Sequence, residues 1–302
     1  MISSPVSKVD KFATFANNEY SQFGEDGIIK KILEYLPNKN NWCVEFGAWD
    51  GIHLSNTFSL IKNNGYQSVL IEADKNKFEE LKKNLMGFNA VLVNKFVMFE
   101  GRNTLDNILS KTKIPDDFDF LSIDIDGNDY YILDSLVRYK PKVICIEYNP
   151  TIPNEVSYIQ PKDFNIKRGS SALAILNLAI SKGYLLAATT KCNLILVDSQ
   201  YWPYLNMEKG RLDELRDDSA IKVFAFSGYD GSIFLSKPLD LCWHNLRVSE
   251  DELQFFPVFL RRFSSDYTAL QKFLFLVFLW VKRPVIFIER LRKKFICLFT
   301  AS

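Results

Sequence analysis

The sequence predicts an α/β fold whose central sheet is parallel except at its end. Short apolar runs bounded by turn residues recur about every 20–25 residues, the interval of a strand followed by a helix. Five such units are followed by one more helix and then by two closely spaced strands. Alternating strands and helices indicate parallel pairing, whereas the short connection of the last two strands favours an antiparallel pair.

The pattern of apolar residues and turn residues predicts the position of each strand and helix. We expect strands at 42–46, 68–72, 90–93, 118–124, 142–147, 184–189 and 193–197. We expect helices at 27–36, 54–63, 75–85, 104–110, 130–138 and 171–182. A further apolar pair, 221–226 and 232–235, flanks SGYDG, which is typical of a hairpin turn. The chain therefore divides into a helical lead-in (1–40), a sheet domain (41–200), an appended strand pair with an irregular segment (201–252) and a tail (253–302).

Composition and charge narrow the class of protein. Of the 302 residues, 47% are apolar and 24% are charged, as in a globular domain. A net charge of +1 gives no reason to expect nucleic acid as a partner. The five cysteines are widely spaced and form no zinc pattern, and the first residues show no apolar run of the kind expected for a signal peptide. These features predict reduced thiols in a cytoplasmic protein.

The tail is basic and apolar. From Leu253 onward it holds nine Lys/Arg and two acids, so it carries +7 and the rest of the chain carries −6. Residues 273–281, FLFLVFLWV, are too few to span a bilayer, which takes about 20. One interpretation is a peripheral contact of 268–302 with the inner face of the cytoplasmic membrane, with Trp280 at headgroup level. The other is a helix packed on the enzyme or on a second subunit of an oligomer.

The segment 42–57, WCVEFGAWDGIHLSNT, is the most informative part of the chain. An apolar strand runs into Glu45 and then into a turn containing Gly47 and Gly51. These glycines let the backbone approach a ligand closely, but the turn is not G-x-G-x-x-G. A carboxylate there repels phosphate and attracts a ligand with an ammonium and a sulfonium, such as S-adenosylmethionine.

Acidic residues stand at the ends of the other predicted strands. Glu72 lies 21 residues past Gly51, near the spacing at which an acid grips a ribose diol. The fourth strand ends at Asp124 and Asp126, and the fifth at Glu147 and Asn149. Ligands of open α/β sheets bind at this edge. The alternative is that these acids cap the helices that follow.

Five segments together resemble the FkbM-type methyltransferases. They are YSQFGEDGII (20–29), VEFGAWDG (44–51), VLIEAD (69–74), FLSIDIDGNDYYIL (120–133) and VICIEYNP (143–150). The resemblance covers about residues 18–200. It implies a class I, Rossmann-like domain of seven strands with the last antiparallel, and S-adenosylmethionine as cofactor. It also implies methyl transfer, often to hydroxyls of sugars or polyketides.

The resemblance assigns cofactor-binding roles by position. Glu45 would bind the methionine ammonium, Gly47 and Gly51 would pass close by, and Glu72 would accept both ribose hydroxyls. The remaining residues expected around the cofactor are Gln22, Gly24, Glu25, Asn56, Thr57, Ala73, Asp74 and Asp124. For the segment 21–25 a helix N-terminus capped by Ser21 is an equal interpretation. Asn56 and Thr57 would lie in the helix after the glycine turn and could simply form part of its face.

Transfer to oxygen requires a base. Asp124 is the first candidate, Asp126 the second, and His53, in the loop after Gly51, the third. A hard divalent cation on Asp124, Glu147 and Asn149 is a further alternative; we favour a reaction without a metal. The predicted function is therefore O-methylation of a saccharide or related small acceptor. The rivals are a nucleotide-cofactor oxidoreductase on the same fold and a non-catalytic membrane-associated scaffold.

Overall fold

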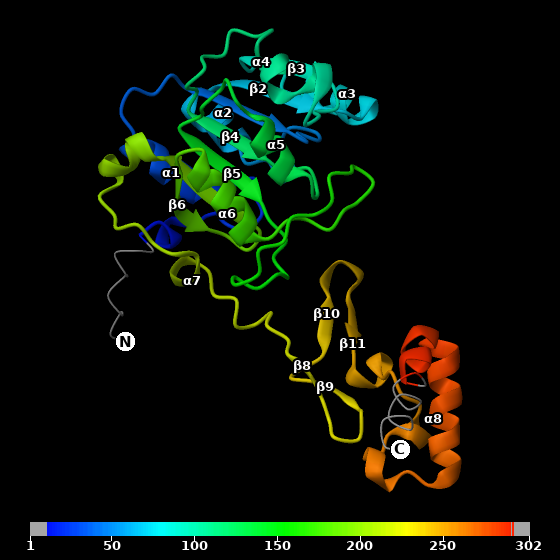
Figure 1. Cartoon of the computed structure of the whole chain (residues 1–302). Helices are drawn as coiled ribbons and strands as arrows, with labels where there is room; N and C mark the ends of the chain where they lie inside the picture. The colour runs from blue at the N-terminus through cyan, green and yellow to red at the C-terminus, as the bar shows by residue number, and fades with distance from the viewer. Residues whose placement is uncertain (1–10, 291, 293–302) are drawn as a thin grey trace. The chain divides into compact units, whose positions relative to one another are not determined.

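A computed structural model describes residues 11–290 and 292 of the chain. The chain divides into two compact units, residues 1–221 and 222–302 (Figure 1). The first unit contains the large sheet and the second contains two small hairpins and the long helix α8.

The first unit is built on a seven-stranded sheet of order β3-β2-β1-β4-β5-β7-β6. Its strands are β1 (Trp42–Phe46), β2 (Gln67–Glu72), β3 (Ala90–Asn94), β4 (Phe120–Ile123), β5 (Val143–Glu147), β6 (Tyr184–Thr189) and β7 (Asn193–Asp198). Strands β1 to β5 run parallel, and β7 pairs antiparallel with both β5 and β6. This confirms the α/β, class I methyltransferase-like fold and its antiparallel last strand. The chain runs outward from β1 to β3 and then returns to β4, so the crevice for a ligand lies between β1 and β4.

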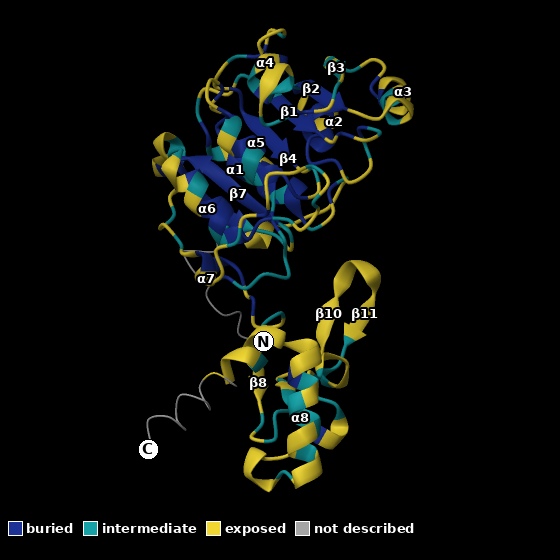
Figure 2. Ribbon diagram, turned by 45° about the vertical axis from the view of Figure 1, so that its right-hand side comes forward, coloured by how far each residue is buried: buried dark blue, intermediate teal, exposed yellow. Residues whose placement is uncertain are grey.

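Helices cover both faces of the sheet. One apolar core, around Leu70 and Cys145, receives α1 (Glu25–Tyr35), α2 (Phe58–Asn64) and α3 (Lys75–Asn84). The other, around Val44 and Ile146, receives α4 (Leu105–Leu109), α5 (Asp129–Ser135), α6 (Ala172–Ser181) and α7 (Leu212–Leu215). Successive strand residues point to opposite faces, so each strand contributes to both cores. All strands except the edge strand β3 are accordingly buried along nearly their whole length (Figure 2).

One predicted helix starts later than expected. The pattern places a helix from residue 54, whereas α2 begins at Phe58, with Thr57 as the residue before it. Residues 55–57 instead form a loop whose polar groups bind Glu45. The expectation that Asn56 and Thr57 lie in this helix is therefore wrong, because hydrogen bonds to the strand outweigh local helical periodicity.

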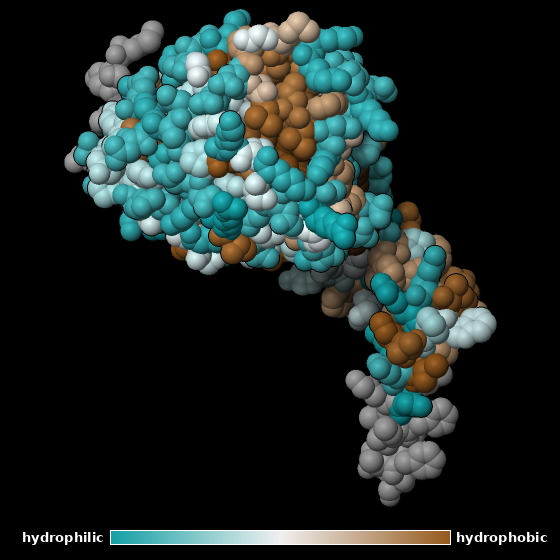
Figure 3. Space-filling view, turned by 90° about the horizontal axis from the view of Figure 1, so that it is seen from above, coloured by the Kyte–Doolittle hydropathy of each residue, from teal (hydrophilic) through white to brown (hydrophobic). Residues whose placement is uncertain are grey.

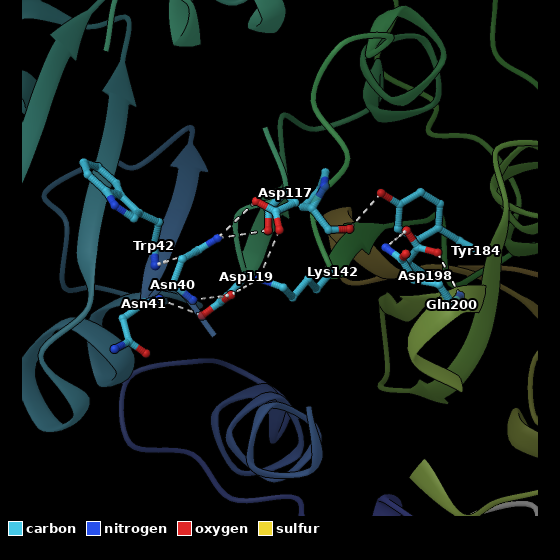
Figure 4. A network of polar contacts seen from close by, with 10 residues as sticks. Asn40, Asn41, Trp42, Asp117, Asp119, Lys142, Tyr184, Asp198 and Gln200 are labelled. Atoms are coloured by element: carbon cyan, nitrogen blue, oxygen red, sulfur yellow. Dashed lines mark hydrogen bonds and ion pairs between the residues drawn. The ribbon is translucent and has the colours of Figure 1, made fainter. Parts of the chain in front are cut away.

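A buried ion pair joins the amino ends of β4 and β5, opposite the ligand-binding edge (Figure 4). The Lys142 ammonium lies 2.6 Å from the Asp119 carboxylate, and both side chains are fully buried. The same carboxylate accepts the backbone amides of Asn40 and Asn41 at 3.1 and 2.8 Å. These bonds compensate for the loss of water around the charges and fix the loop that leads into β1.

The second unit is small and largely exposed. It contains β8 (Ala225–Ser227), β9 (Ile233–Leu235), β10 (Leu239–Leu241), β11 (Leu246–Val248) and α8 (Ala269–Lys282). β8 and β9 pair antiparallel around the turn 228–232, which confirms the hairpin predicted at SGYDG. β10 and β11 form a second antiparallel pair.

Helix α8 exposes one apolar stripe. Leu270, Phe273, Val277, Trp280 and Val281 are all exposed. At 100° per residue they fall within an arc of about 100°. In the part of the chain that the structure describes, no helix is both long and apolar enough to cross a membrane. Peripheral contact through 268–302 stays a prediction, and of this segment residues 291 and 293–302 lie outside the described residues.

Candidate active site

The predicted site residues come from the carboxyl ends of β1, β2, β4 and β5. These four ends lie side by side in the sheet order. They bring Glu45, Glu72, Asp124 and Glu147 to the same edge of the sheet, as the strand-end acids predict. The four carboxyl groups nevertheless have different surroundings and different tasks.

Glu45 clamps the glycine turn to the sheet. Its carboxylate accepts the hydroxyls of Ser55 and Thr57, each at 2.6 Å, and the backbone amide of Asn56 at 2.9 Å. Burial raises the pKa of Glu45, while these hydrogen bonds oppose the rise. Three of about four acceptor sites on the carboxylate are thus used within the protein. One remains for a ligand ammonium.

Asn56 adds a second tie to the sheet. Its side-chain amide donates to the Ser122 hydroxyl of β4 at 3.1 Å, and the residue is buried. The structure therefore gives the predicted cofactor residues Glu45 and Asn56 a shared structural role, which is to hold the loop that borders the site.

The two glycines of the turn serve different neighbours. Gly47 has φ +70°, and a Cβ there would lie 2.5 Å from the backbone oxygen of Asp124. Gly51 has φ +79°, and a Cβ there would meet Leu81 and Leu85 of the α3 region. Gly47 thus permits β1 and β4 to approach at the crevice, whereas Gly51 permits α3 to pack against the turn.

Glu72 joins the ends of β1 and β2. Its carboxylate accepts the backbone amide of Trp49 at 2.8 Å and that of Asp74 at 2.7 Å. Asp74 is the N-cap of α3, accepting the amides of Asn76 and Lys77. Trp49 does not cover a core: it is half exposed, and the Lys77 ammonium lies 4.8 Å from its ring centre.

Beside Glu72 is a cavity of about 170 Å³. Its walls are largely apolar and include the three predicted residues Gly47, Glu72 and Ala73. The other lining residues are Phe46, Ile71, Lys95, Phe96, Val97, Ile125, Asn128, Phe164 and Lys167. Phe96 and Phe164 meet edge to face with ring centres 4.8 Å apart. A flat heterocycle suits such a wall of rings and aliphatic side chains.

Asn128 presents an unpaired acceptor at this cavity. The side chain is 2% exposed, and its Oδ1 has no hydrogen-bond partner among the described residues. Burying an acceptor without a donor costs free energy, so a water or a ligand that supplies the donor would be stabilised here. An exocyclic amino group of a base is a donor of that kind. The cavity therefore fits the adenosine part of S-adenosylmethionine.

The amino-terminal motif forms a tightly bonded helix start. Glu25 is fully buried and accepts Thr190 Oγ1 at 2.5 Å and Asn193 Nδ2 at 3.0 Å, which joins α1 to the β6–β7 hairpin. Asp26 accepts the amides of residues 19, 20 and 21, and Ser21 Oγ accepts the amide of Asp26. Gln22 is exposed. The segment is therefore a helix start, as one interpretation expects, but the N-cap of α1 is Gly24, with φ +98°, and not Ser21.

An acidic cluster stands at the end of β4 and β5. Ligand-type oxygens of Asp124, Asp126 and Glu147 all lie within 4.8 Å of one another. Asp124 is accessible to solvent, but surrounding protein and then the nearby Asp126 charge raise its pKa to about 6. Burial and the charges of Asp124, Asp129 and Asp126 raise the pKa of Glu147 to about 10. Glu147 is thus protonated at neutral pH and shares a hydrogen bond with Asp124.

The loop that carries Asp124 and Asp126 is held in place by hydrogen bonds to Asp129. Asp129, at the start of α5, accepts the amides of Ile125 and Gly127, each at 2.9 Å. Asp126 has φ +54° and lies 3.4 Å from the Lys167 ammonium. Asp129 thereby holds the turn that presents Asp124 and Asp126 at the edge of the crevice.

Two further predicted candidates have other surroundings. The Asn149 side chain forms hydrogen bonds with the Arg168 carbonyl and with Thr151 within its own loop. The acid that lies with Asp124 and Glu147 is Asp126. His53 is exposed in a turn in which its backbone amide donates to Asp50.

Part of this site lies in a region that matches a known protein family. Residues 102–186 match the family model described as the methyltransferase FkbM domain. The resemblance is confirmed over that range, which contains β4, β5 and the acidic cluster. The segments around Glu45 and Glu72 lie outside it. No curated protein matches the sequence.

Solved structures with a similar sheet are remote in sequence. TrmK of M. capricolum, in complex with S-adenosyl-homocysteine, is 14% identical with a TM-score of 0.34, over 56% of this chain and 65% of that one. A SAM-dependent methyltransferase from Aquifex aeolicus is 12% identical (TM-score 0.36, 58% and 90%). An O-methyltransferase from Bacillus cereus in complex with SAH is 15% identical (TM-score 0.40, 65% and 93%). The chain thus spans slightly less than two thirds of the TrmK structure.

Sequence reasoning missed several residues of the cavity. Asn128 belongs to the same IDIDGND segment as Asp124, and its place directly after a strand-end glycine was the available signal. Phe164 and Lys167 come from the long segment between β5 and α6, which has no periodicity that would place it. Only the folded loop shows that it returns to the crevice.

Proposed function

We propose that this protein is an S-adenosylmethionine-dependent methyltransferase that methylates a hydroxyl of a saccharide or a related small acceptor. The observation that carries the proposal is the pairing, at one edge of the sheet, of a largely apolar cavity lined by aromatic rings with an open carboxylate of raised pKa. The family match supports the reaction class.

The cofactor would lie across the ends of β1, β2 and β4. Asn128 Oδ1 offers an acceptor to the base, and Glu72 lies where a ribose would follow. Each oxygen of the Glu72 carboxylate accepts one backbone amide. Each oxygen therefore has a second lone pair that can accept a ribose hydroxyl. The fourth acceptor site of Glu45 and the narrow approach at Gly47 suit the amino-acid end.

Asp124 is the proposed base. When bound, S-adenosylmethionine supplies a methyl group on a sulfonium. Asp124 takes the proton from the acceptor hydroxyl as the new carbon–oxygen bond forms. The products are the methyl ether and S-adenosylhomocysteine, with the proton left on Asp124. A pKa of about 6 keeps Asp124 ionised at neutral pH yet basic enough to accept that proton. Most of the rate must come from positioning the two reactants.

The two rival functions find less support. A nicotinamide or flavin dinucleotide would bring its pyrophosphate to the glycine turn, where Glu45 and Glu72 repel it. A scaffold without catalysis would not need an unpaired buried acceptor such as Asn128 Oδ1 at a cavity.

Isothermal titration calorimetry of the full chain tests the proposal. We expect binding of S-adenosylmethionine and S-adenosylhomocysteine and none of NAD. Asn128→Ala should weaken binding of S-adenosylhomocysteine about tenfold, because one hydrogen bond to a buried group is lost. The control Asn107→Ala lies away from the cavity and should bind normally. Tight NAD binding without S-adenosylhomocysteine binding would refute the assignment. A panel of monosaccharides and glycosides with radiolabelled cofactor would then identify the acceptor.

A further inference from the structure

The C-terminal unit contains a hollow that the proposed methyltransferase site does not use. Its volume is about 490 Å³, within the range of sites that bind small molecules. The lining comes from the β8–β9 turn, the segment 256–267, helix α8 and Arg290. All of these residues belong to the unit 222–302, so the hollow is complete within that unit.

Three cations converge on the hollow. Arg262 approaches from the segment before α8, Lys272 from the first turn of α8, and Arg290 from beyond its end. Among the residues that the structure describes, none of the three forms an ion pair with a carboxylate. Like charges held together without a counterion repel one another, so the arrangement favours an anion.

Among the described residues that line the hollow, Asp230 is the one acid, and it offsets only one of the three cations. Asp230 Oδ1 accepts the backbone amide of Ser232 at 3.0 Å and also its hydroxyl, which ties one oxygen of the carboxylate into the hairpin turn. These hydrogen bonds, led by that of the hydroxyl, lower the pKa of Asp230. The lining therefore carries a net charge of +2 at neutral pH.

The remaining wall is aromatic and firmly held. The Phe275 ring of α8 lies 5.8 Å from the rings of both Phe256 and Tyr267, centre to centre. Tyr267 is fixed by a 2.6 Å hydrogen bond to the Leu260 carbonyl. The hairpin turn presses on the same wall, since a Cβ at Gly231 would lie 2.8 Å from Phe256. Hydrophobic and hydrophilic side chains accordingly lie side by side on this unit (Figure 3).

We propose that this hollow binds a phosphate monoester carried on an apolar or aromatic body. A phosphate monoester carries a charge of about −1.5 to −2 near neutral pH, which matches the lining better than a single carboxylate does. Guanidinium groups such as those of Arg262 and Arg290 bind phosphate oxygens in pairs, and Lys272 adds a point charge. The rings of Phe256, Tyr267 and Phe275 would cover the body of the ligand.

Such a group can come from a free phosphorylated metabolite or from a lipid headgroup. The first arm of the test uses 4-methylumbelliferyl phosphate as probe, with uncharged 4-methylumbelliferone as its control, in equilibrium dialysis against the full chain. The second arm uses sedimentation with phosphatidylcholine vesicles that contain or lack phosphatidic acid. Binding in the first arm alone identifies a soluble ligand, and binding that requires phosphatidic acid identifies a lipid.

Two lysines of the same helix give a matched pair of variants. Lys272→Gln removes a cation of the hollow, and Lys282→Gln removes one that does not line it. We expect Lys272→Gln to weaken binding about tenfold, as loss of one charge-assisted hydrogen bond does. Lys282→Gln should bind as the parent chain does, and Arg262→Gln should repeat the loss.

Three results would overturn the proposal. They are no binding in either arm, equal losses in Lys272→Gln and Lys282→Gln, and displacement of the probe by S-adenosylhomocysteine, which would place the probe in the first unit. Because the hollow and the methyltransferase site belong to different units, failure of one assignment leaves the other standing.

Discussion

The Glu45 carboxylate, near the end of β1, accepts a 2.9 Å hydrogen bond from the backbone amide of Asn56. With the hydroxyls of Ser55 and Thr57 it forms a buried clamp that sets the path of the chain into α2. An acid expected to meet the ligand is therefore first a structural residue. Its role can be tested without any ligand.

Glu45→Gln should destabilise the protein by about 2 kcal/mol, because an amide cannot accept all three donors and leaves buried groups unpaired. Urea denaturation of the free protein measures this. The control Glu34→Gln removes an exposed acid that pairs only with Lys31 and should change stability by less than about 0.5 kcal/mol. If the two variants were equally stable while Glu45→Gln lost S-adenosylmethionine binding, the carboxylate would serve the ligand instead of the fold.

The rate of methyl transfer should rise with pH through about 6, the pKa of Asp124. Below that pH the carboxyl is protonated and cannot accept the hydroxyl proton, so kcat/KM should fall about tenfold per pH unit. Asp126→Asn removes a neighbouring negative charge and should move the profile to lower pH. Asp124→Asn should abolish activity while keeping the fold. A flat profile from pH 5 to 8, or an active Asp124→Asn variant, would exclude Asp124 as the base.

Activity should survive treatment with a chelator. Burial and the neighbouring acids raise the pKa of Glu147 to about 10, which favours a protonated Glu147 that donates a hydrogen bond to Asp124 and lessens the repulsion within the acidic cluster. Glu147→Gln reproduces the protonated form and should keep activity within about threefold, since it retains a donor toward Asp124. Turnover is measured with and without EDTA for both proteins. Loss of activity on chelation, restored by Mg²⁺, would instead make Asp124, Asp126 and Glu147 a metal site.

Removing one partner of the buried Lys142–Asp119 pair should destabilise the protein far more than removing one partner of an exposed pair. Lys142→Met leaves the Asp119 charge buried without its partner and should cost about 3–5 kcal/mol. The matched control is Lys82→Met, because Lys82 and Glu79 also lie 2.6 Å apart but are about half exposed. That change should cost less than about 1 kcal/mol. Equal losses in urea denaturation would mean that burial does not determine the strength of this pair.

Much of the first unit was predictable from the sequence because its strands are short, apolar and separated by helices. Strand β1 begins and ends at the predicted residues, and the acids at its neighbours' ends meet at one edge, as strand order requires. Burial on both faces gives such strands a nearly continuous apolar run, which is the signal that the sequence carries most clearly.

The site could be predicted only in part, because hydrogen bonding decides what each acid does. Nothing in the sequence distinguishes Glu45, whose carboxylate binds its own loop, from Asp124, whose carboxylate is open to solvent. The pairing of Lys142 with Asp119 joins residues 23 positions apart and has no local pattern. The loop that brings Phe164 to the cavity also has no periodic pattern from which its path could be predicted.

Gly47 should be the most sensitive glycine of the site. Gly47 and Gly65 have nearly the same backbone conformation, with φ of +70° and +67°. A Cβ at Gly65 would meet no atom within 4 Å, whereas one at Gly47 would lie 2.5 Å from the Asp124 carbonyl oxygen. Gly65→Ala should therefore cost only the backbone strain, about 1 kcal/mol. Gly47→Ala should cost about 2 kcal/mol more, because the end of β4 must move.

The movement of the end of β4 in Gly47→Ala should also make this variant less active than Gly65→Ala. Moving the Asp124 backbone shifts its carboxylate away from the acceptor, and misplacement of about 1 Å can cost about a hundredfold in rate. We therefore expect Gly65→Ala to keep its kcat and Gly47→Ala to lose at least that factor, with both variants assayed well below their unfolding temperatures. If Gly47→Ala were as stable and as active as Gly65→Ala, the contact between the glycine turn and β4 would not position the base.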